Sequence, residues 1–75
     1  MEAKLFDNNG ILKQIEEIDG YDVTLEKLNG EYCFELEFDL KDGSTIQIIL
    51  PIDVADGIRS EISSQKNRWE YFHRT

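Results

Sequence analysis

Residues 21–50 decide the fold of this chain, and their sequence is YDVTLEKLNGEYCFELEFDLKDGSTIQIIL. Apolar and polar residues alternate in three runs, which is typical of strands that bury one face. The dipeptide Asn29-Gly30 between the first two runs indicates a two-residue hairpin loop, because both positions of that turn need positive φ. This loop pairs Leu25 with Phe34, Val23 with Leu36 and Tyr21 with Phe38, so that all six side chains share one face.

The second turn lies at Lys41-Asp42-Gly43. A two-residue loop would set Phe38 opposite Gln47 and mix the two faces. A three-residue loop with Gly43 in the left-handed conformation instead pairs Phe38 with Ile46, Leu36 with Ile48 and Phe34 with Leu50. The sequence therefore predicts a three-stranded antiparallel meander over residues 21–28, 31–40 and 44–50, with Leu36 and Ile48 buried.

A helical pattern follows the meander. Apolar residues recur at roughly helical spacing after Pro51, with Asp53 as a candidate N-cap; they are Val54, Ile58, Ile62, Trp69 and Phe72. A helix of about 20 residues would be about 30 Å long and could lie across the apolar face of the sheet. We expect it to fray or break near Ser63-Ser64, where helix propensity is weak.

The segment before the meander also has a helical stripe, formed by Ile11, Leu12, Ile15 and Ile18. A strand here would turn Gln14 and Glu16 toward the same side as the apolar residues. A short helix over residues 9–19, with Gly20 as its C-cap, is therefore favoured. The predicted fold class is α+β, a single domain of residues 1–75 with the element order α-β-β-β-α.

Charge is unevenly distributed along the chain. The formal net charge is −8, from sixteen acidic and eight basic residues. Through Gly57 there are fourteen Asp or Glu against four Lys, whereas from Ile58 onward four basic residues outnumber two acidic ones; the basic residues are Arg59, Lys66, Arg68 and Arg74. A strongly negative protein repels nucleic acid and attracts basic protein surfaces. Direct nucleic-acid binding is therefore disfavoured.

Few residues suit enzyme or cofactor chemistry. His73 is the only histidine, and the only cysteine, Cys33, lies among acidic residues, which disfavour a reactive thiolate. There is no glycine-rich phosphate loop, and neither Gly10 nor Gly43 fits the calcium-loop pattern. We predict no enzymatic activity, no cofactor and no bound metal. A lone cysteine, and the lack of a signal peptide or a spanning apolar run, predict a cytoplasmic protein without membrane contact.

The predicted registers gather acidic residues on the second face of the sheet. Glu37 would directly oppose Asp22, and like charges at such positions weaken a sheet. Alternate residues of a strand are about 6.8 Å apart, so an acidic strand presents an evenly spaced row of anions that could occupy lysine and arginine sites that normally hold phosphates. This face is either a solvated surface or a docking surface for a basic protein. The candidate partner-binding residues are Asp22, Glu26, Glu35, Glu37 and Asp39.

The layout of these elements resembles that of small acidic anti-CRISPR proteins from phages of Gram-positive bacteria, which inhibit type II-A Cas9. The matching pieces are residues 11–18, the strand that starts at Tyr21, the Asp42-Gly43 turn and the helix ending in Trp69; no diagnostic motif is present. The resemblance implies an inhibitor that occupies the DNA-recognition cleft of a nuclease as a DNA mimic. The alternative is a small homodimeric structural or regulatory protein of a mobile element, without DNA mimicry. It would dimerise through the edge of the third strand or the aromatic end around Trp69 and Phe72.

Overall fold

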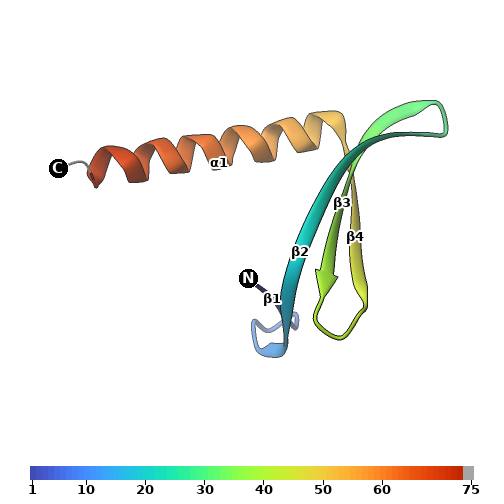
Figure 1. Cartoon of the computed structure of the whole chain (residues 1–75). Coiled ribbons are helices and arrows are strands. Elements are labelled where there is room, and N and C mark those ends of the chain that lie inside the picture. Colours follow the sequence, from blue (N-terminus) through green and yellow to red (C-terminus); the bar gives the residue numbers. More distant parts are fainter. Residues whose placement is uncertain (74–75) are drawn as a thin grey trace.

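The computed structural model describes residues 1–73. Four antiparallel strands form one sheet in the order β1-β2-β3-β4, and a single helix follows them. The elements are β1 (Glu2–Phe6), β2 (Leu12–Leu28), β3 (Glu31–Leu40), β4 (Thr45–Pro51) and α1 (Ile52–Phe72). The sheet is curled into a half-barrel, and α1 extends away from it (Figure 1). The predicted order with an N-terminal helix and three strands is therefore wrong.

Both hairpins of the predicted meander are confirmed. Asn29 and Gly30 have φ of 50° and 83°, and every predicted pair between β2 and β3 is present, including Val23 with Leu36. The second loop has three residues: Gly43 has φ of 90°, and its N–H donates to the Leu40 carbonyl at 3.0 Å. Leu36 accordingly pairs with Ile48. Burial of the apolar face was thus a valid criterion for choosing the loop length.

The N-terminal segment is a hairpin, because it contains another Asn-Gly turn, at Asn9-Gly10 between β1 and β2. Gly10 has φ of 78°, and the Asp7 carboxylate accepts hydrogen bonds from the backbone N–H groups of Asn9 at 2.8 Å and Ile11 at 3.0 Å. This loop turns β1 back onto the first half of β2, where Ala3 pairs with Glu16. The helix predicted over residues 9–19 is therefore a strand, and its capping residue Gly20 lies inside β2.

A bulge at Asp19 joins the two halves of β2. Ile18 pairs with Leu40 and Gly20 pairs with Asp39, so Asp19 is an extra residue on β2. The bulge keeps Ile18 on the apolar face although the spacing to Tyr21 is odd. Gln14 and Glu16 do fall on that face. Gln14 is exposed, Glu16 is half-buried, and the Gln14 side-chain amide donates a hydrogen bond to the Glu16 carboxylate.

The helix differs from the prediction in its start, its continuity and its position. It begins at Ile52 directly after β4, with Pro51 at the N-cap position and no side-chain cap, so Asp53 lies in the first turn instead. It runs unbroken through Ser63 and Ser64 to Phe72. Only its first part contacts β3 and β4, and the rest projects away from the sheet (Figure 1). Arg74 lies outside the described residues.

The interior of the chain is very small. Among residues 1–73 only Ile18, Cys33 and Leu40 are buried. Leu36 is half-buried and Ile48 is 43% exposed, so the prediction that both are buried is wrong for the isolated chain. No helix in the described part of the chain is long and apolar enough to cross a bilayer.

Candidate functional site

The acidic face of the sheet is built around the middle strand. Every second residue of β3 from Glu31 to Asp39 points to this face, because side chains alternate along a strand. The register places Asp22 opposite Glu37 and Glu26 opposite Cys33. Cys33 and Glu35 are neighbours on this face of β3. All five predicted partner-binding residues therefore share one surface, which we call the acidic face: Asp22, Glu26, Glu35, Glu37 and Asp39.

None of these five carboxylates has a cationic partner among residues 1–73. The ion pairs there join Lys41 to Glu17, Arg59 to Asp56 and Lys66 to Glu70. The two lysines nearest in sequence are engaged elsewhere: Lys41 lies 2.9 Å from the Glu17 carboxylate, and Lys27 lies over the Tyr32 ring. Directly opposed like charges such as Asp22 and Glu37 weaken a sheet, where an opposite pair would contribute about 0.2–1 kcal/mol.

Crowding of negative charge is strongest at Glu35. Partial desolvation raises the pKa of Glu35, and the charges of Glu26 and Glu37 raise it further. Asp42, in the loop beyond β3, shows the opposite effect: hydrogen bonds donated by the hydroxyl and backbone N–H of Ser44 lower the pKa of that carboxyl. Glu35 therefore lies where the negative charges of the acidic face are most crowded.

Apolar side chains lie among the carboxylates. Leu28 and Ile49 are both exposed, and Ile49 pairs directly with Glu35 across β3 and β4. An N-terminal helix would cover these residues if one were present; without it they form an exposed apolar centre among the carboxylates. Because the N-terminal segment is a hairpin, no such helix covers them. A charged surface with an exposed apolar centre has the composition of a protein–protein interface.

Metal and nucleophile sites find no geometric support in residues 1–73. No group of three His, Cys, Asp or Glu side chains converges closely enough to hold a metal ion. Cys33 is a buried free thiol in the middle of the sheet. His73 follows the end of α1, where its ring stacks on Trp69 and its Nδ1 lies 2.8 Å from the Trp69 carbonyl oxygen.

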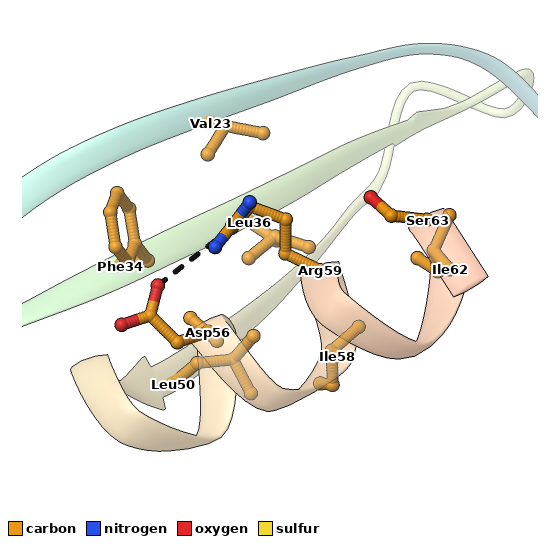
Figure 2. Close-up of a pocket in the computed structure, with 10 residues that line it drawn as sticks. Val23, Phe34, Leu36, Leu50, Asp56, Ile58, Arg59, Ile62 and Ser63 are labelled. Carbon is orange, nitrogen blue, oxygen red and sulfur yellow. Dashed lines mark ion pairs between the residues drawn. The ribbon is translucent and has the colours of Figure 1, made fainter.

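A concave feature that was absent from the sequence-based predictions lies on the opposite face of the sheet. It is an open cleft of about 360 Å³ between the sheet and the first half of α1. Val23, Phe34 and Leu36 form its floor, and Ile58 and Ile62 form its helical wall (Figure 2). Its one ion pair, Asp56 with Arg59 at 3.9 Å, is exposed to solvent. A helix lying across the whole apolar face, as the sequence suggested, would have left no such cleft.

Comparison with protein families, with curated proteins and with solved structures found nothing that matches this chain. The layout resemblance to anti-CRISPR proteins started from a helix that the structure shows to be a hairpin. The arguments for function therefore come from the two faces of the sheet.

Proposed function

We propose that this protein is a non-enzymatic binding protein whose acidic face docks on a basic protein surface. The leading form is a DNA mimic, an inhibitor from a phage or mobile element that occupies the nucleic-acid cleft of a nuclease or other nucleic-acid-binding protein. One observation carries the proposal: five carboxylates share a face, and none has a cation among residues 1–73. A basic partner would supply the missing positive charge.

The spacing of the acidic row supports mimicry of a nucleic acid backbone. Glu35, Glu37 and Asp39 repeat at about 6.8 Å along β3. Duplex DNA likewise presents regularly spaced anions along each strand. A cleft that holds phosphates with lysine and arginine would find comparable anions here. The same surface repels nucleic acid itself, so the partner is a protein.

The proposal needs no cofactor, metal or membrane. The only cysteine is buried and unpaired, which fits a reducing compartment such as the cytoplasm, that of the host cell for a phage protein. The alternative is a homodimeric structural or regulatory protein of a mobile element, without DNA mimicry. One observation favours it, the exposure of the aromatic end of α1, where Trp69 and Phe72 are 60% and 73% exposed.

The test is capture from host lysate at low salt with three immobilised proteins. They are the wild type, the charge reversal Glu35→Lys with Glu37→Lys, and the matched reversal Glu61→Lys with Glu70→Lys on α1, which changes net charge equally. We expect the wild type and the α1 variant to retain a nucleic-acid-binding protein that high salt or excess duplex DNA releases. The acidic-face variant should lose it. Equal capture by all three proteins would remove the acidic face from the function.

A further inference from the structure

The surface of this chain is too large for a compact protein of its size. A folded monomer of 8.8 kDa exposes about 4,800 Å², whereas this chain exposes 6488 Å². Its radius of gyration is 15.7 Å, against about 11 Å for a compact domain of 75 residues. About 1,700 Å² of surface that a compact fold would hide is therefore exposed.

Two apolar features account for much of the exposed apolar surface, and they face each other only in part. The first is α1, a helix of 21 residues with no buried residue. Its apolar stripe includes Ala55, Ile58, Ile62 and Trp69, and the opposite side carries Ser60, Ser64 and Asn67. Helices in water gain most of their stability from packing such a stripe. Ile62 is 63% exposed, so the stripe lacks most of its packing partner.

The second feature is the concave apolar face of the sheet. Tyr21, Val23 and Leu25 of β2 are all exposed on it, although β3 supplies half-buried Phe34 and Leu36 beside them. The first half of α1 leaves an open cleft above these residues (Figure 2). The face therefore has room for a further apolar element.

The chain cannot complete this packing by itself. Pro51 ends β4 and Ile52 begins α1, so there is no loop that would let the helix fold back over its own sheet. Trp69 lies 17 residues beyond Ile52, about 26 Å along the helix axis. The second half of α1 thus projects away from the sheet that its stripe would fit (Figure 1).

We propose that a second copy of this chain completes the fold, with α1 of each copy lying on the concave sheet face of its partner. Each copy offers a helix that needs an apolar surface and an apolar surface that needs a helix. A two-fold axis satisfies both needs at once, as in isologous dimers. If each copy hides its excess surface, the dimer buries about 3,400 Å², within the range of about 2,000–5,000 Å² for obligate homodimers.

Charge also favours this arrangement over contact between sheets through their acidic faces. Residues 1–51 hold twelve acidic and four basic residues, whereas residues 52–72 hold four acidic and three basic ones. The nearly neutral helix can approach a partner sheet with little repulsion. Both acidic faces remain on the outside of the dimer. The proposal stands independently of any role for the acidic face.

Sedimentation equilibrium and the fluorescence of Trp69, the single tryptophan, test the dimer. We expect twice the mass of 8.8 kDa at micromolar concentration, with blue-shifted emission that moves to the red on dilution. Ile62→Asp should shift the equilibrium to monomer. Ser64→Asp, with the same added charge on the opposite side of α1, should leave the dimer intact. A folded wild-type monomer at high concentration would overturn the proposal.

A measurement on the wild type avoids dependence on variants that fail to fold. In a mixed sample of isotope-labelled and unlabelled chains, filtered NOE spectra detect only contacts between copies. We expect contacts from the Trp69 indole of one copy to the methyl groups of Val23 and Leu36 of the other. Within one chain Trp69 does not line the cleft that holds these two residues, and it lies about 10 Å along the helix beyond Ile62, which does. A dimer with no such contacts would overturn this geometry, and so would a monomer that binds only a different protein through the same face.

Discussion

The two faces of the sheet are both incomplete, and they differ in what would complete them. The acidic face exposes carboxylates and has no cation paired with its five named members in residues 1–73. The concave face exposes apolar side chains such as Val23 and Leu25 beside an open cleft. An unpaired surface carboxylate stays solvated in water, whereas an exposed apolar surface loses the main driving force for folding.

This difference assigns the two faces to different kinds of contact. The concave face needs a permanent partner, since the chain buries only Ile18, Cys33 and Leu40 among residues 1–73. The acidic face tolerates water and suits a partner that binds and leaves, with association guided by charge and weakened by salt. Substitutions on the two faces should therefore affect different quantities.

The largest expected effect comes from removing apolar volume from the concave face. If a second copy covers Leu36, Leu36→Ala should cost about 2–5 kcal/mol in free energy of unfolding. Urea denaturation at fixed protein concentration measures it. Glu37→Ala, the adjacent residue of β3 on the other face, is the control and should change stability by less than about 0.5 kcal/mol. A loss for Leu36→Ala no larger than the control would show that the concave face stays exposed in solution.

A smaller effect of opposite sign is expected on the acidic face. Replacing Glu37 by lysine turns its repulsive pair with Asp22 into an attractive one, worth about 0.2–1 kcal/mol. The variant Glu35→Lys with Glu37→Lys should therefore be as stable as the wild type or more stable, while losing its basic partner. Added salt should stabilise the wild type more than the variant, because it screens the repulsion. A clear loss of stability would mean that the repulsion between these carboxylates is negligible.

The meander and the acidic face were predictable because local signals and burial agreed there. Asn29-Gly30 and Gly43 set the two loops, and only one register kept Leu36 and Phe38 on the apolar side. The N-terminal hairpin carried the same kind of signal in Asn9-Gly10. It was missed because Gln14 and Glu16 broke the alternation, and a bulge such as that at Asp19 shifts the faces without any diagnostic residue.

The position of the helix was missed for a different reason. The apolar stripe from Ile58 to Trp69 indicates that α1 packs against an apolar surface, but it does not indicate whether that surface belongs to the same chain or to another. The apolar periodicity of a helix is the same whether the helix packs within a monomer or across a dimer interface. The lack of a loop after Pro51 was the available signal, because a helix that continues directly from a strand cannot return across its sheet.

The smallest expected effect is a pH dependence centred on Glu35. Because partial desolvation and the charges of Glu26 and Glu37 raise the pKa of Glu35, the folded chain favours the protonated carboxyl more than the unfolded chain does. Stability from this group is complete below the pKa of the unfolded chain and is lost as pH rises through the raised folded pKa. Carbon-13 NMR titration of the Glu35 carboxyl should show the raised pKa, and Glu26→Gln should lower it, whereas the distant Glu61→Gln should not.

A basic partner favours the carboxylate, so binding should release a proton and affinity should increase with pH across the same window. A pKa of Glu35 that is unchanged by the partner would place the bound surface away from β3.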